Sequence, residues 1–268
     1  MKKHHTAAHI TIVIVILYLL TPLLFTAAYS VFEKWTGLLP EGFTLKHYVE
    51  LLTEEDFMLS LGRTVLICII PILLTILLVL LALFVVTIYF PRLEKYVQIL
   101  CMIPYTIQGV ILSVSILSLY AGSGTLLDNR LVMLIGAYCI IILPHIYQGI
   151  RNSMHAVNMP MLLEAAEMLG CSKLHGFFRV IVPNIISGIT VSSLLAVGII
   201  FGDYVLIRNI AGTSFKNVQI YLFLEMKSSS TKASAVFVII MVTTFLITAL
   251  VLFLKSRESK GKLQKGKG

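Results

Sequence analysis

Long apolar segments without charged residues constrain this sequence more than any other feature. One of them runs from Val65 to Phe90 and contains no Asp, Glu, Lys or Arg. As a helix it would rise about 39 Å, whereas the hydrocarbon core of a bilayer is about 30 Å thick. We therefore expect this segment to cross a membrane as a helix that tilts, or that kinks near Pro71.

Six segments of this kind predict an all-α membrane protein with six transmembrane helices. The expected spans cover residues 10–29, 65–90, 97–120, 131–150, 185–201 and 233–254. The composition agrees, because 58% of the residues are hydrophobic, 13% are charged and the mean hydropathy is +0.94, far outside the usual range of soluble domains. One transmembrane domain, residues 10–254, thus lies between a short N-terminal segment, 1–9, and a basic tail, 255–268, that we predict to be disordered.

The distribution of basic residues predicts the orientation of the spans. With both termini in the cytoplasm, 13 of the 21 Lys and Arg residues fall on the cytoplasmic side, as the positive-inside rule favours. The first span follows a basic start and resembles a signal peptide, but we expect it to stay uncleaved, because its removal would leave five crossings. This topology explains the net charge of +8, so we expect no nucleic acid partner.

The polar stretch 158–183, between the fourth and fifth spans, carries clear helix start and stop signals. Asn158 is the predicted N-cap of a first helix, and Gly170 suits the left-handed position just past its end. Ser172 is predicted to cap a second short helix, which Pro183 separates from the fifth span. We therefore expect an elbow made of a helix, a glycine and a second helix.

The first helix of this elbow has an apolar face at helical spacing, with Glu164 and Glu167 pointing elsewhere. Its members are Met161, Leu162, Ala165, Met168 and Leu169. Such a helix is also what an amphipathic connector lying on the membrane surface would contain. Local physics alone leaves both interpretations open.

A spaced motif in the elbow resembles a known family signature. The motif has Glu164, Ala165 and Ala166 followed by Gly170, and it ends on Pro183. Written as EAAEMLG and then VIVP, it is similar to the cytoplasmic signature of permease subunits of binding-protein-dependent ABC importers. The two valines of VIVP stand where that family usually has isoleucine and leucine. Overall, the chain looks most similar to the spermidine/putrescine and 2-aminoethylphosphonate permease group.

The resemblance implies a permease subunit that carries a small solute, first of all a polyamine such as spermidine or putrescine, across a bacterial-type cytoplasmic membrane. It implies that the elbow sits in a groove of a separate ABC ATPase subunit. Glu164 would pair with that subunit, Ala165 and Ala166 would permit close approach, and Gly170 would set the elbow angle. The other partners implied are a second permease subunit, preferably in a heterodimer, an extracytoplasmic solute-binding protein and membrane lipid.

No motif for nucleotide binding, catalysis or metal binding is present in the sequence. A P-loop of the form GxxxxGK[ST] is missing, so we expect no cofactor on this chain and ATP-Mg in the ATPase subunit. No Ser-His-Asp or HExxH arrangement is evident, and the chain is not expected to be an enzyme. The four cysteines form no CxxC pair, and we expect them to be reduced and to hold no metal.

Polar residues inside or beside the spans are candidates for the solute pathway. Gln108 lies in the third span, and Asp203 and Tyr204 follow the fifth. Polyamine-type members of the resembled family also have an acidic residue at that point. A cationic solute would be attracted by Asp203 and by the ring of Tyr204, although an aspartate at the membrane boundary needs no special role.

The connection 31–62 is the longest polar one, and it is acidic. Trp35, the single tryptophan, suits a membrane–water interface. On the outer side this connection would face the solute and the binding protein, or it would simply be solvated.

Other functions stay open on the sequence. The same importer class carries 2-aminoethylphosphonate or ferric iron in related groups. A channel or secondary transporter that works without an ATPase would make the elbow a surface helix. An intramembrane enzyme would need reactive groups that converge in the bundle, and the modest candidates are His145, Cys101 and Cys139.

Overall fold

The computed structural model describes residues 2–35, 40–212 and 214–265, with side chains described for 11–35, 40–212 and 214–253. Within these residues, five helical segments are long and apolar enough to cross a membrane, and a sixth is counted when one bent pair is taken together. The five are α1 (Lys2–Tyr29), α3 (Glu55–Tyr89), α6 (Arg130–Ala156), the segment Lys173–Gly202, and α12 (Ser230–Lys265). The predicted all-α membrane class is confirmed.

The third span is broken, which corrects the single helix expected over 97–120. It consists of η1 (Pro91–Leu93), α4 (Glu94–Met102), η2 (Ile103–Thr106) and α5 (Gly109–Tyr120). The two halves meet at 102°. Pro104 has no N–H with which to continue a helix, and the backbone is extended at Ile107 and Gln108. The bend therefore follows from a proline and a short extended linker within the apolar run.

The fifth span is longer than predicted, because Pro183 does not interrupt it. Helix α8 (Lys173–Gly176) passes into the π-helix η4 (Phe177–Ile181) and then into α9 (Val182–Gly202). In the wider π-turn the N–H of Val182 donates to the carbonyl of Phe177. Pro183 follows directly, in the first turn of α9, where its missing N–H costs little. The predicted stop at Pro183 was therefore wrong.

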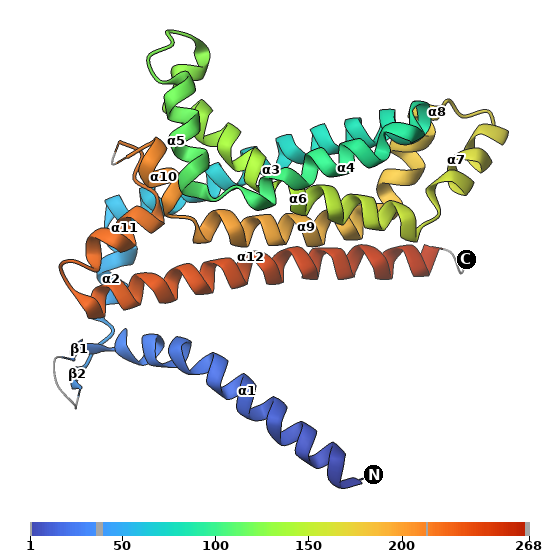
Figure 1. Ribbon diagram of the computed structural model, residues 1–268. Helices are drawn as coiled ribbons and strands as arrows, with labels where there is room; N and C mark the ends of the chain where they lie inside the picture. The colour runs from blue at the N-terminus through green and yellow to red at the C-terminus, as the bar shows by residue number, and fades with distance from the viewer. Residues whose placement is uncertain (1, 36–39, 213, 266–268) are drawn as a thin grey trace.

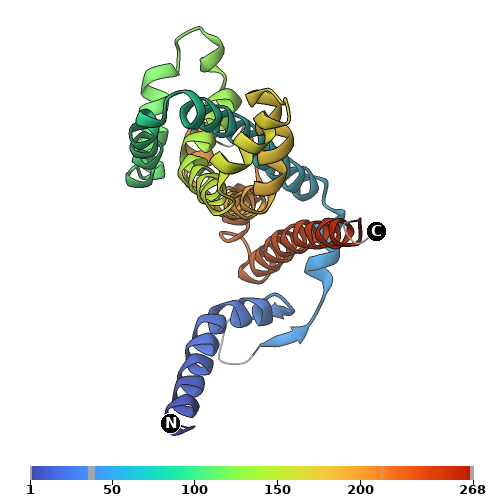
Figure 2. The same ribbon diagram turned by 90° about the vertical axis from the view of Figure 1, so that its right-hand side faces the viewer.

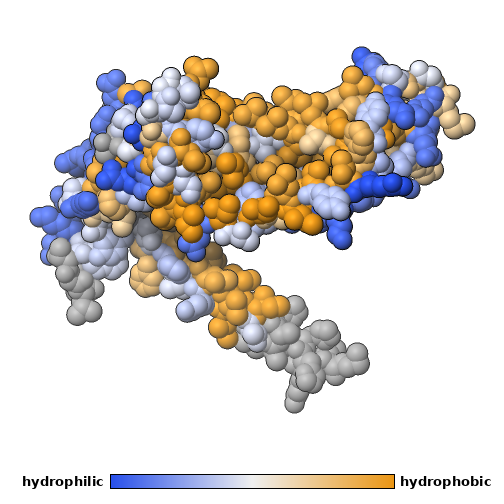
Figure 3. Space-filling model, turned by 45° about the horizontal axis from the view of Figure 1, so that its top comes forward, coloured by the Kyte–Doolittle hydropathy of each residue, from blue (hydrophilic) through white to orange (hydrophobic). Residues whose placement is uncertain are grey.

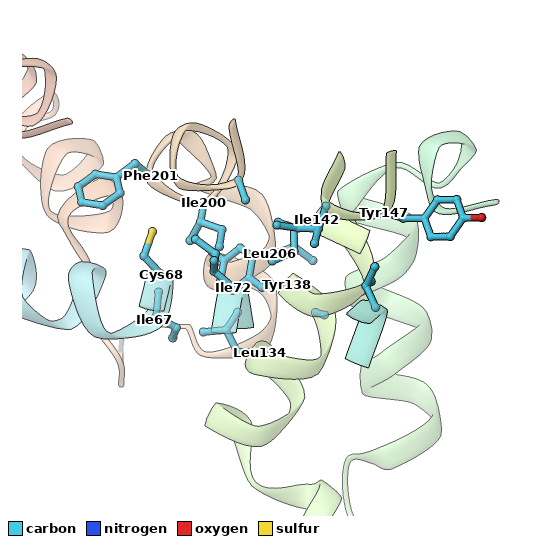
Figure 4. Packing of buried hydrophobic residues seen from close by; sticks show 14 of the residues in the cluster. Ile67, Cys68, Ile72, Leu134, Tyr138, Ile142, Tyr147, Ile200, Phe201 and Leu206 are labelled. Carbon is cyan, nitrogen blue, oxygen red and sulfur yellow. The ribbon is translucent and has the colours of Figure 1, made fainter. Parts of the chain in front are cut away.

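Helix α6 lies at the centre of the bundle, between α3 and α9. Its inward face carries Tyr138, Ile142, Ile146 and Ile150, all fully buried. Figure 4 shows part of this packing, with Ile72 of α3 and Ile200 of α9 beside Tyr138. By contrast, α1 diverges from the bundle (Figures 1 and 2), and its side chains from 11 to 25 are exposed.

Two polar ends flank a broad apolar middle, as Figure 3 shows. One end carries α7 (Met159–Met168), near which α12 ends, whereas α1 begins on the same side of Figure 1 but far below α7. The other end carries α2, η3, α10, α11 and a hairpin of β1 and β2. Their bounds are Lys46–Thr53, Leu126–Asp128, Val205–Ile210, Val218–Glu225, Phe32–Lys34 and Glu41–Phe43. We call them the α7 end and the α2 end.

Two features of the chain ends and connections differ from expectation. Helix α12 continues to Lys265, so part of the tail predicted to be disordered is helical. The hairpin in the connection 31–62 was not predicted. It pairs Phe32 with Phe43 in antiparallel register, and the ring of Trp35 stacks on Tyr29 at 4.6 Å. Aromatic rings therefore gather where α1 ends, as the interface position predicted for Trp35 would require.

Candidate functional site

The elbow begins at a sharp turn between α6 and α7. Asn158 has φ 49° and ψ 59°, in the left-handed region, and its side chain makes no capping hydrogen bond. Its backbone N–H instead donates to the carbonyl of His155 at 3.2 Å. Asparagine is among the residue types that tolerate this conformation. Asn158 therefore occupies the predicted N-cap position, but its side chain does not cap α7 and its left-handed backbone reverses the chain.

The end of α7 follows the sequence prediction closely. Gly170 has φ +81°, and its N–H donates to the carbonyl of Glu167 at 2.9 Å while that of Cys171 donates to Ala166 at 3.0 Å. These two bonds form a Schellman motif, which closes a helix through a left-handed glycine. Ser172 then accepts a hydrogen bond from the His175 N–H at 3.4 Å and caps α8. Hydrogen bonds thus hold both sides of the joint between the two helices.

The buried face of α7 is not the face predicted. Met159, Leu163 and Ala166 are buried, and a Cβ on Gly176 of α8 would lie 3.2 Å from Leu163 and 3.3 Å from Ala166. Ala166 therefore makes a close contact inside this chain, where the missing side chain of Gly176 leaves room. Of the five residues of the predicted apolar face, only Leu162 is partly buried. The other four are exposed, namely Met161, Ala165, Met168 and Leu169.

The outer side of the elbow exposes large apolar side chains at a polar end of the molecule. Met161 is 67% exposed, Met168 89% and Leu169 86%. Glu164 is also exposed, and Glu167 pairs with Lys173 at 3.8 Å. Apolar groups gathered beside charges on an otherwise polar surface are typical of a docking site for another protein.

Two contacts that were not predicted connect the elements around the elbow, one between η4 and α3 and one between α6 and α4. The rings of Phe177 and Phe84, on η4 and α3, lie 5.1 Å apart. Arg151 near the end of α6 donates from Nε to Glu94 Oε1 of α4 at 2.9 Å, and both side chains are about one quarter exposed. The sequence held a signal for this ion pair, because Glu94 lies just before the third apolar run and Arg151 directly follows the fourth.

A cavity of about 300 Å³ lies towards the α2 end, between the bend of the third span and the end of α9. Its lining consists of Gln108, Gly109, Val110, Tyr138, Ile141, Ile199, Gly202, Asp203, Val205 and Leu206. Two of the three predicted pathway residues, Gln108 and Asp203, therefore line one cavity, and the bend places Gln108 there. Tyr204 is not among the lining residues, and its ring lies 4.8 Å from that of Phe223.

Asp203 has a structural role in this cavity wall. Its Oδ2 atom accepts hydrogen bonds from the Tyr138 hydroxyl at 3.0 Å and from the Leu206 N–H at 3.1 Å. It thereby satisfies an N–H in the first turn of α10. Of the lining residues that the structure describes, Asp203 alone carries a charge, so the cavity favours a positively charged group.

One family of known proteins matches more than half of this chain. Residues 93–260 match a family model described as "Binding-protein-dependent transport system inner membrane component". No curated protein matches the chain. The matched range contains the bend of the third span, the elbow and all residues that line the cavity.

Two solved structures share the fold over nearly the whole chain. A bacterial ABC transporter involved in the import of the acidic polysaccharide alginate is 15% identical, with a TM-score of 0.70, and the match covers 95% of this chain and 96% of that one. The bacterial alginate ABC transporter in complex with an alginate pentasaccharide-bound periplasmic protein is 16% identical, with a TM-score of 0.71, and the coverage is 96% and 94%. At these identities the likeness shows the fold alone.

Proposed function

This chain belongs to the family of inner membrane components of binding-protein-dependent transport systems, and we propose that it is a permease subunit of an ABC importer that a separate ATPase drives from the α7 end. The exposed apolar surface of α7, on a helix closed by a hydrogen-bonded joint, carries this proposal. In this proposal the α7 end and both termini face the cytoplasm.

The contacts of the elbow support a lever that couples ATP hydrolysis to the spans. Ala166 packs against Gly176, so a push on α7 reaches the start of the fifth span directly. From there the ring contact between Phe177 and Phe84 leads to α3. An ATPase that binds α7 differently in its open and closed states would thereby favour one of two packings of the bundle. Glu164, exposed beside the apolar side chains, would contact the ATPase.

The cavity supports a small cationic solute as the cargo, and we propose a polyamine such as spermidine or putrescine. Asp203 supplies a negative charge, and the lining residues include no positive one. Alginate, the acidic cargo named for the two similar structures, would meet only repulsion from that carboxylate. The ammonium groups and the carbon chain of a polyamine suit a single charge at the wall of a largely apolar cavity.

We further propose three partner proteins. An ABC ATPase would dock on α7, and a solute-binding protein would dock at the α2 end. A second, related permease subunit would complete the pathway, since α1 leaves a long apolar surface exposed beside the bundle. A related rather than identical subunit is favoured because such pairing is usual in the polyamine group that the chain as a whole resembles.

Replacing Leu169 with Glu tests the docking surface. We expect Leu169→Glu to abolish co-purification with the ATPase subunit while the chain still inserts into the membrane. Leu126→Glu is the matched control, because Leu126 is equally exposed but lies at the α2 end. Normal ATPase association of Leu169→Glu would overturn the proposed docking surface and would favour a channel or secondary transporter.

Cargo-stimulated ATP hydrolysis tests the transported solute. Proteoliposomes would contain this chain, its neighbouring permease, the ATPase and the binding protein. The solutes compared are spermidine, putrescine, 2-aminoethylphosphonate and ferric iron. Stimulation by spermidine or putrescine, and by neither of the other solutes, supports the proposal. Stimulation by 2-aminoethylphosphonate or ferric iron would reassign the cargo and leave the importer class intact.

A further inference from the structure

Helix α2 has three distinct faces, which follow from the turn of about 100° per residue. Tyr48 and Leu51 point into the protein, where Leu51 is fully buried. Lys46 and Glu50, one turn apart, form an exposed ion pair at 3.5 Å. Between these two faces lies a third one, which is both apolar and exposed.

The exposed apolar face consists of Leu45, which is the N-cap of α2, and of Val49 and Leu52, at positions i, i+4 and i+7. They are 55%, 63% and 57% exposed. We call this set the α2 stripe. Neither the contacts of the bundle nor the acidic character of the connection 31–62 explains why three large apolar side chains line up on one side of a short helix.

Contacts to three spans determine where α2 lies. The hydroxyl groups of Tyr48 and Ser30 are 2.6 Å apart, and Ser30 directly follows α1. Glu54, the C-cap of α2, accepts a hydrogen bond from Lys232 of α12 at 3.0 Å, and α3 begins at the next residue. The helix therefore lies beside the points where the apolar run of α1 ends and that of α12 begins, close to the level of the membrane surface.

We propose that α2 is an interfacial helix whose stripe of Leu45, Val49 and Leu52 enters the lipid while its Lys46 and Glu50 side faces water. Amphipathic helices lie in a bilayer surface in this way, with one face buried at the boundary of headgroups and acyl chains. This placement goes beyond the proposed transport function and holds for any cargo.

Continuity with the lipid-facing surface favours lipid over a protein as the occupant. Exposed apolar side chains resume on the first turns of α3, at Met58 and Leu59. The charged side of α2, formed by Lys46 and Glu50, lies directly beside the α2 stripe. This arrangement matches the change from hydrocarbon to water across a headgroup layer.

The single tryptophan makes a direct test possible. Trp35→Phe removes the native fluorophore and keeps an aromatic ring near Tyr29. In that background, Val49→Trp reports on the stripe, and Lys46→Trp is the matched control on the charged side of the same helix. The full chain is reconstituted in vesicles of phosphatidylcholine with bromine atoms on the acyl chains near the headgroup, and acrylamide is the quencher in water.

We expect the brominated lipid to remove most of the emission of Val49→Trp and little of that of Lys46→Trp, with the reverse for acrylamide. Leu52→Trp repeats the test if Val49→Trp does not fold. A stripe residue that acrylamide quenches and brominated lipid does not would show a solvated helix. A stripe residue that neither reagent quenches would show that protein covers the stripe, and either result overturns the proposal.

Discussion

The backbone carbonyl of Gly149 on α6 lies so close to Gly188 on α9 that a Cβ on Gly188 would stand only 2.7 Å from the oxygen. The side chain of Ser153 would be nearer still. The two helices therefore touch backbone to backbone at the centre of the bundle. Small residues at such crossings allow the close packing that holds membrane helices together, because hydrocarbon offers little hydrophobic drive between helices.

Gly188→Ala is expected to destabilise the bundle by about 1–3 kcal/mol, the usual range for overpacking. The new methyl group meets backbone atoms, which cannot rotate away, so α6 and α9 must separate. Unfolding of the chain in detergent measures the change. Gly198→Ala is the matched control on the same helix, since a Cβ there meets nothing within 4 Å, and alanine should stabilise a helix by up to about 1 kcal/mol. Equal stability of the two variants would contradict the close crossing.

Gly170→Val is expected to uncouple ATP hydrolysis from transport while membrane insertion stays normal. The space around Gly170 is open, but its φ of +81° is unfavourable for any residue with a Cβ, at a cost of about 1–2 kcal/mol. The backbone at residue 170 would then adopt another conformation, and α7 would no longer be held at the same angle to α8. Gly170→Asn should keep most transport, because asparagine tolerates this conformation better. Full transport by Gly170→Val in proteoliposomes would count against a rigid lever.

The pair of Glu54 and Lys232 should make stability depend on acid pH. Burial raises the pKa of Glu54, but the hydrogen bond of Lys232, the neighbouring Tyr221 hydroxyl and the charge of Lys232 together outweigh it and hold that pKa below its usual range. Because the folded pKa is the lower one, the stabilisation is complete above the unfolded value of about 4.3. It is lost as the pH falls through the folded pKa.

Glu54→Gln should therefore unfold at a lower temperature than the unmodified chain at neutral pH and lose less stability on acidification. Thermal unfolding between neutral pH and pH of about 3 follows the difference. Glu50→Gln serves as the control, since its pair with Lys46 is exposed and contributes little. Parallel pH profiles for Glu54→Gln and the unmodified chain would refute the contribution of the pair.

The sequence predicted those features of the fold that depend on local chemistry. Uncharged apolar runs located the spans, since only helices or closed barrels satisfy backbone groups in hydrocarbon. Gly170 and Ser172 were identified correctly because left-handed closure and hydroxyl capping each need particular residue types. Gln108 and Asp203 were named from polarity alone, and the fold places both at one cavity.

Features that depend on neighbouring elements could not be predicted in the same way. The apolar residues of α7 fit two faces by spacing, and only the position of Gly176 determines that Leu163 and Ala166 are buried. The bend at Ile107 lies in an apolar run that is long enough for one span. Pro104 alone does not predict a break, since Pro71 and Pro144 lie inside continuous helices. Pro183 is a usual helix stop, yet the π-helix before it lets the fifth span continue.

Asp203→Asn separates the charge of this residue from its structural role. The amide oxygen of asparagine can still accept the hydrogen bonds of Tyr138 and Leu206, so α10 should keep its position. A charged hydrogen bond contributes about 1.5–3 kcal/mol, so the KM for spermidine should rise about 10-fold to 100-fold. Asp128→Asn removes a charge from the exposed turn at the same end and should leave KM unchanged. An unchanged KM in Asp203→Asn would assign Asp203 to helix capping alone, whereas a lower KM would indicate an anionic cargo.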